Sequence, residues 1–137
     1  MTAVRDIMTK GVDYADPSTT VLEVAKKLAS ENYGSMPICD GDSLQGIITD
    51  RDIVVKVLAE GKDPATTQVG DLVQGDVVTI GADDSVEEAA RMMAEHQVRR
   101  LPVVDGSKLV GMLSQADLAL ANDDRTTGDT VQAISST

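Results

Sequence analysis

Hydrophobic and polar positions along this chain follow one pattern twice. Short apolar runs rich in β-branched residues occur at 12–15 and 77–80, and each run predicts a strand. After each run, apolar side chains recur at helical spacing, which predicts a helix with one buried face. These apolar positions are Val21, Val24/Ala25 and Leu28/Ala29 in the first copy, and Val86, Ala89/Ala90 and Met93/Ala94 in the second.

Both predicted helices begin with the sequence of a capping box. Thr20 is followed three residues later by Glu23, and Ser85 by Glu88. In this motif the hydroxyl and the carboxylate satisfy backbone amides that have no partner at a helix start. The pattern therefore fixes where each helix begins as well as which face is buried.

A hairpin and a second helix are predicted next in each copy. Apolar strands at 36–39 and 101–104 end in Asp-Gly, the dipeptide favoured in turns that need positive φ. Return strands follow at 44–48 and 109–113, and helices begin after Thr49 and Ser114. The first of these helices is predicted over 50–58, before the helix breakers Gly61 and Pro64. Each copy thus has the order strand, helix, strand, strand, helix.

The pattern recurs because the chain is a tandem duplication. Residues 4–53 reappear at 69–118, 65 positions apart and without a gap. We expect a first repeat at 1–61, a linker at 62–68, a second repeat at 69–121 and a tail at 122–137 that is frayed or forms one short helix. A unit of roughly 60 residues buries too little surface to be comfortably stable alone, so the two repeats are expected to pack together.

Charge and hydropathy limit the classes of partner. The 137 residues carry a formal net charge of −11, which disfavours nucleic acid and anionic membranes because both bind through surplus Lys and Arg. No segment reaches roughly 18 uninterrupted apolar residues, so no membrane span is predicted and a cytoplasmic location is expected. An anionic ligand would need a locally basic pocket.

Few residues are suited to catalysis or metal binding. Cys39 is the single cysteine and is interpreted as a buried core thiol, and His96 is the single histidine. No Ser/His/Asp constellation and no two-histidine metal pattern can be built from them, so neither an enzyme nor a metal site is expected. The acidic pairs Asp50/Asp52 and Asp83/Asp84 could hold Mg²⁺. Their position at helix starts, where the helix dipole stabilises negative side chains, explains them better.

The two copies share an apolar-Pro-apolar run, Asp-Gly, and Gly-x-x-Thr/Ser-x-x-Asp. With these motifs, residues 4–121 resemble a pair of cystathionine-β-synthase (CBS) domains, the Bateman module, and in particular stand-alone bacterial CBS-pair proteins. The resemblance implies an α/β (α+β) fold of two tandem repeats packed as a pseudo-twofold pair. It also implies a homodimer in which two modules form a flat disc, and a regulated protein partner.

The resemblance further implies a ligand in the cleft between repeats: AMP, ADP or ATP, or in some members S-adenosylmethionine or NAD. Asp52 and Asp117 would accept hydrogen bonds from the ribose hydroxyls, since a carboxylate offers paired acceptors. Thr49 and Ser114 would face ribose or phosphate at helix starts. Arg99 and Arg100 would contact phosphate, and with Arg51 and His96, which lie nearby in the sequence, they would offset the acidic surroundings. The ligand-binding residues implied are Thr49, Arg51, Asp52, Val12, Ile38, Ser114, Asp117, Arg99, Arg100, Val77 and Ile80, of which the aliphatic ones would form the adenine slot.

Two interpretations stay open for these motifs. Thr49-x-x-Asp52 and Ser114-x-x-Asp117 also have capping-box spacing, and Arg99-Arg100 could be a solvated surface pair. The copies also differ, because Gly34-Ser35 stands where the second copy has Arg99-Arg100. A regulatory energy or stress sensor that binds an adenosine nucleotide is therefore weighed against a ligand-free interaction scaffold with the same fold.

Overall fold

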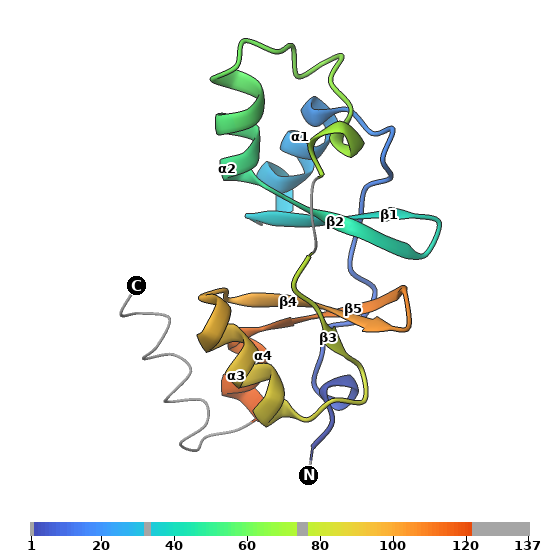
Figure 1. The fold of residues 1–137 in the computed structure, drawn as a ribbon, viewed down its shortest axis with the longest axis vertical. Helices are drawn as coiled ribbons and strands as arrows, with labels where there is room; N and C mark the ends of the chain where they lie inside the picture. Colours follow the sequence, from blue (N-terminus) through green and yellow to red (C-terminus); the bar gives the residue numbers. More distant parts are fainter. Residues whose placement is uncertain (1, 32–33, 74–76, 122–137) are drawn as a thin grey trace. The chain divides into compact units, whose positions relative to one another are not determined.

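The computed structural model describes residues 2–31, 34–73 and 77–121 (Figure 1). These residues form two compact units, each with its own hydrophobic core. We call Asp13–Val77 the first-repeat unit, and the described residues 2–12 and 78–121 the second-repeat unit. The tail predicted at 122–137 lies outside the described residues.

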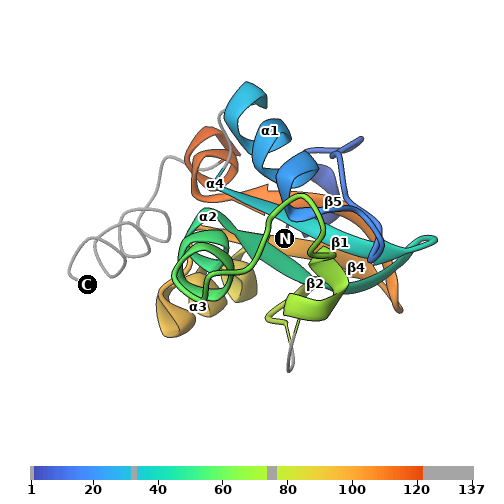
Figure 2. The same cartoon turned by 90° about the horizontal axis from the view of Figure 1, so that it is seen from above.

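The first-repeat unit is a hairpin with two helices on one face (Figure 1). Its elements are α1 (Val21–Glu31), β1 (Ser35–Asp40), β2 (Ser43–Thr49), α2 (Asp50–Asp52), the π-helical η2 (Ile53–Leu58) and the 3-10 turn η3 (Val69–Leu72). From the perpendicular view, α1 and α2 stand next to each other over the hairpin (Figure 2). Since η2 continues α2 without a break, the predicted helix over 50–58 is confirmed.

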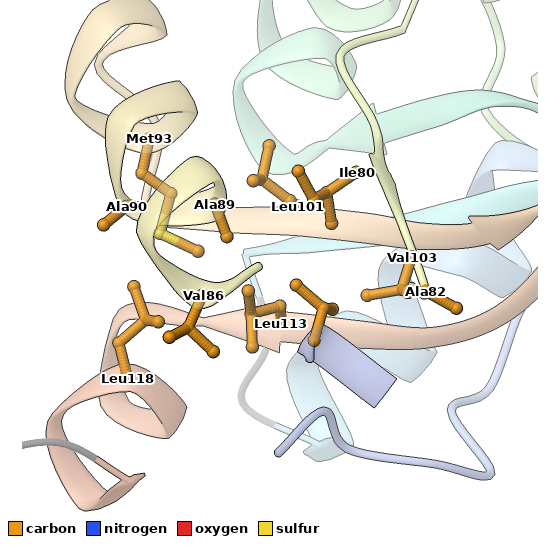
Figure 3. Packing of buried hydrophobic residues seen from close by; sticks show 11 residues of the cluster. Ile80, Ala82, Val86, Ala89, Ala90, Met93, Leu101, Val103, Leu113 and Leu118 are labelled. Atoms are coloured by element: carbon orange, nitrogen blue, oxygen red, sulfur yellow. The ribbon is translucent and has the colours of Figure 1, made fainter. Parts of the chain in front are cut away.

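The second-repeat unit repeats this plan. Its elements are η1 (Val4–Asp6), β3 (Ile80–Gly81), α3 (Val86–His96), β4 (Arg100–Asp105), β5 (Lys108–Ser114) and α4 (Gln115–Ala121). β3 pairs parallel with β4, and β4 pairs antiparallel with β5. The core lies between this sheet and the helices α3 and α4, where Met93, Leu101, Leu113 and Leu118 point toward one another (Figure 3).

The predicted hairpins are confirmed down to the turn residues. Gly41 and Gly106, the second residues of the two Asp-Gly pairs, both have φ +66°. Only a residue without Cβ adopts this region at no cost, which explains the dipeptide. Each hairpin also shifts register at the same repeat position, between Ile38 and Cys39 and between Val103 and Val104.

The strands predicted at 12–15 and 77–80 are largely wrong. In the first-repeat unit only Ala15 is paired, in a parallel bridge to Ile38, and in the second the strand is the two-residue β3. A turn follows each short pairing directly and ends it. The Asp16 carboxylate accepts a hydrogen bond from the Ser18 amide, and the Asp84 carboxylate accepts one from the Gly81 amide. Asp side chains that bond nearby backbone amides in this way compete with strand pairing, which the apolar pattern does not report.

The predicted helix starts are confirmed, and in the part of the chain that the structure describes the hydroxyl half of each cap is present. Thr20 Oγ1 accepts from the Glu23 amide at 3.2 Å, and Ser85 Oγ from the Glu88 amide at 3.1 Å. The Glu88 carboxylate pairs instead with Arg91, one turn along α3. An i,i+3 ion pair on the helix surface thus takes the carboxylate that the motif assigned to the cap.

The leading segment of each sequence repeat completes the unit of the other repeat. Val4, in the first repeat, is fully buried in the second-repeat unit, and the Val4 amide donates to the carbonyl of Asp84 at 2.8 Å. Val69, in the second repeat, is fully buried in the first-repeat unit, and its amide donates to the carbonyl of Thr19 at 2.9 Å. The compact units are therefore not the repeats as they lie in the sequence.

Candidate functional site

The Thr49-x-x-Asp52 motif lies where β2 passes into α2, and it forms a reciprocal capping box. The Asp52 amide donates to Thr49 Oγ1 at 3.0 Å, and the Thr49 amide donates to Asp52 Oδ2 at 2.9 Å. Both side chains are half-buried. The cap that the sequence left open as one interpretation is thus present in the structure.

The Ser114-x-x-Asp117 motif has the same geometry between β5 and α4. The Asp117 amide donates to Ser114 Oγ at 3.0 Å, and the Ser114 amide donates to Asp117 Oδ2 at 2.9 Å. In both copies, therefore, Oδ2 of the aspartate is committed to the cap. Each carboxylate oxygen offers two lone pairs, so Oδ1, which takes no part in the cap, can accept from a further donor.

Different side chains approach Oδ1 in the two copies. Lys56, one turn along the helix, has its Nζ 3.4 Å from Asp52 Oδ1. In the second-repeat unit the Thr9 hydroxyl lies 3.3 Å from both oxygens of Asp117. Since an O–H···O bond is usually 2.5–3.0 Å, the Thr9 contact is a long, shared one.

The neighbouring strand places the predicted arginines beside the Ser114 motif. Arg100 is opposite Ser114 in the β4–β5 register, and the Gln115 amide donates to the carbonyl of Arg99 at 2.8 Å. The first-repeat unit makes the same backbone bond, from the Asp50 amide to the carbonyl of Gly34 at 3.0 Å, but without arginine side chains. Arg51 is exposed in the first turn of α2.

The four aliphatic candidates divide into two kinds. Ile38 and Ile80 belong to the hydrophobic cores, with 0% and 3% of their surface exposed. Val12 and Val77 are half-buried, so part of each side chain remains accessible within its unit. The contribution of all four to an adenine slot stays a prediction.

An open pocket of about 220 Å³ lies beside Asp117. Of the described residues, Ile7, Asp117, Leu120 and Ala121 line it, and all belong to the second-repeat unit. The pocket combines one carboxylate with three apolar side chains. A carboxylate beside an apolar surface can accept hydrogen bonds from the hydroxyl groups of a ligand.

Sequence reasoning did not find Thr9, Ile7 or Lys56. Thr9 and Asp117 are 108 positions apart, and no local pattern reports such a contact. Lys56 carried a usable signal, because it stands four residues after Asp52 on the same predicted helix, the spacing at which opposite charges pair.

The cysteine, possible metal ligands and helix lengths of the described residues were also considered in the sequence. Cys39 is fully buried, as predicted, and burial raises the pKa of its thiol. Among residues 2–31, 34–73 and 77–121, no three His, Cys, Asp or Glu side chains come together as a metal site would require. No helix in these ranges is both long and apolar enough to cross a bilayer.

Known proteins match this chain over most of its length. The CBS-domain family model matches residues 4–59 and 69–124. Hypoxic response protein 1 of Mycobacterium tuberculosis is 42% identical over 120 residues, which are 87% of this chain and 84% of the relative. A crystal structure of that protein with two coordinated zinc ions matches with a TM-score of 0.81 and covers 88% of this chain and 99% of its own.

Two further solved structures contain adenosine compounds. CBSX2 in complex with AMP is 28% identical, with a TM-score of 0.77, and the match covers 88% of this chain and 96% of that one. The CBS domain pair of protein MJ0100, in complex with 5′-methylthioadenosine and S-adenosyl-L-methionine, is 30% identical, with a TM-score of 0.73 and coverage of 88% and 95%. With its duplicated helix–hairpin–helix plan and two matches to the family model, the chain belongs to the CBS-domain family as a tandem pair.

Proposed function

We propose that this protein is a regulatory module that senses energy or stress state by binding AMP, ADP or ATP in the cleft that CBS repeats form. The proposal assigns it binding rather than catalysis. Asp52 and Asp117 are the two candidate acceptors for the ribose, Thr49 and Ser114 lie next to them, and Arg99, Arg100 and Arg51 supply positive charge. A ligand that prefers one arrangement of the repeats shifts the equilibrium between arrangements, which a partner protein can read.

One observation carries this proposal: the cap engages Oδ2 of each aspartate and leaves Oδ1 as an acceptor beside a helix start. The AMP and S-adenosylmethionine complexes of the related proteins support the choice of an adenosine ligand. A chain with a net charge of −11 also needs the local arginines to hold a phosphate.

Thermal unfolding with AMP, ADP and ATP in turn tests the proposal. A ligand that binds the native state at 100 times its Kd adds about 2.7 kcal/mol to the free energy of unfolding, so the midpoint temperature rises. Asp117→Asn retains an oxygen for the Ser114 amide but removes the charge. We expect this variant to lose most of the ligand-induced rise.

Ser85→Ala is the matched control, because it removes a helix cap from the same unit away from the motif. It should lower stability by about 1 kcal/mol and leave the ligand-induced rise unchanged. No rise with any of the three nucleotides at millimolar concentration would contradict the sensor and favour the ligand-free scaffold, in which the capping boxes have no second role.

We also propose a homodimer, with a second copy on the exposed apolar face of η2. Val54, Val55 and Leu58 are 56%, 47% and 55% exposed, although they lie in adjacent turns of one helix. Contiguous exposed apolar side chains of this kind mark association surfaces. Leu58→Glu should shift the mass measured by sedimentation toward that of the monomer. Glu60→Lys, on the exposed turn that follows, is the control and should leave the mass unchanged. An unchanged mass in Leu58→Glu would contradict this interface.

A further inference from the structure

The two aspartate sites differ in what stands next to them, and the duplication shows which residue makes the difference. Positions 65 apart correspond in the two repeats. Asp52 corresponds to Asp117, Leu72 to Ile7 in the leading segment, and Lys56 to Ala121. The pocket beside Asp117 is lined by Ile7 and Ala121, so the first-repeat unit has Leu72 and Lys56 at the equivalent places.

In the first-repeat unit the Lys56 side chain crosses that place. Its Nζ lies 3.4 Å from Asp52 Oδ1 and 3.5 Å from the carbonyl oxygen of Leu72. The ammonium group therefore bridges the aspartate and the leading segment, which are the two sides of the open pocket in the other unit. Ala121 ends at Cβ and cannot make either contact.

We infer that Lys56 is an internal occupant that closes the Asp52 site, so that each chain binds one adenosine nucleotide, with its ribose on Asp117. This inference rests on the proposed function and adds which of the two aspartate sites is open to the nucleotide. A ribose hydroxyl reaches Asp52 Oδ1 only by displacing an ammonium group, which must then be solvated again. At Asp117 it replaces one long hydroxyl contact from Thr9.

The size of the pocket agrees with this assignment. Whole ligand sites usually measure about 300–1,000 Å³, so the 220 Å³ beside Asp117 holds the ribose rather than the complete nucleotide. Adding a lysine side chain at Ala121 would fill much of that space. In the first-repeat unit, Lys56 places a side chain of this type across the equivalent position.

An opposite role for Lys56 is also chemically reasonable, because a lysine can hold phosphate. The Asp52 site would then bind nucleotide more tightly than the Asp117 site, and removal of Lys56 would weaken binding. The two roles predict opposite changes in the number of ligands bound.

Exchange of the two residues tests the inference, with AMP titrated into the full chain by calorimetry. We expect about one AMP per chain for the unmodified protein, about two for Lys56→Ala and none for Ala121→Lys. Both positions are exposed on helices, and alanine and lysine are good helix formers, so the fold should persist and circular dichroism checks it. Lys56→Ser, which removes both the charge and most of the bulk, serves if Lys56→Ala does not fold, and it should likewise raise the number to about two.

The combined Lys56→Ala/Ala121→Lys variant should again bind about one AMP, and Asp52→Asn should now abolish that binding. If the unmodified protein binds two AMP per chain, or if Lys56→Ala leaves the number at one or lowers it, the inference is overturned while the proposed function stands. If none of these proteins binds AMP, ADP or ATP, the proposed function is overturned, and the inference with it.

Discussion

At the residue scale, the Ser114 cap allows a quantitative prediction. Ser114→Ala removes the hydroxyl that accepts from the Asp117 amide, so the free energy of unfolding should fall by about 1 kcal/mol. Ser107→Ala changes the same residue type on the exposed hairpin turn, and surface changes of this kind stay within about 0.5 kcal/mol. Chemical denaturation measures both variants, and equal losses in the two would mean that the hydroxyl does not cap α4.

Cys39 gives a pH dependence at the same scale. Burial disfavours the thiolate and raises the pKa of Cys39 in the folded protein above its unfolded value. The unfolded chain therefore loses the proton first, so stability is unaffected below the ordinary thiol pKa and falls as the pH rises above it. Cys39→Val introduces the residue found at the equivalent Val104, and it should remove this alkaline decrease in equilibrium unfolding measurements. A decrease of equal slope in both proteins would assign it to other groups.

At the element scale, close approach between a leading segment and a hairpin explains the glycine kept in both copies. A Cβ on Gly111 would lie 2.7 Å from Met8 Sδ and 2.8 Å from the carbonyl oxygen of Thr9. The backbone oxygen cannot turn away as a side chain can, so Gly111→Ala should destabilise by about 1–3 kcal/mol. Gly34→Ala is the control, because the nearest atom to a Cβ added there, Asp50 Oδ2, lies at 3.7 Å. Denaturation that ranks Gly34→Ala as the more harmful change would contradict the close approach.

Elements with a local cause could be predicted, and those with a distant cause could not. Gly41 and Gly106 specify their turns within two residues, and Thr20 and Ser85 specify helix starts within four. The 12–15 strand failed because Asp16 turns the chain directly after it. At the site, Asp52 and Asp117 could be proposed from spacing, whereas Thr9 could not, because its approach to Asp117 depends on the leading segment packing in the second-repeat unit.

At the scale of the whole molecule, exchanged leading segments mean that damage to one repeat should appear in the unit of the other. Val4 and Val69 correspond in the repeats, and both are fully buried. Val4→Ala and Val69→Ala each remove two methylene equivalents from a core, a loss of about 2 kcal/mol. Val4→Ala should speed amide hydrogen exchange in β4 and β5, and Val69→Ala in β1 and β2, since local opening follows local packing. If Val4→Ala loosened β1 and β2 instead, each repeat would carry its own leading segment. Confirmation of the crossed pattern would explain why two short repeats share one chain: neither unit has a complete core without residues from both repeats.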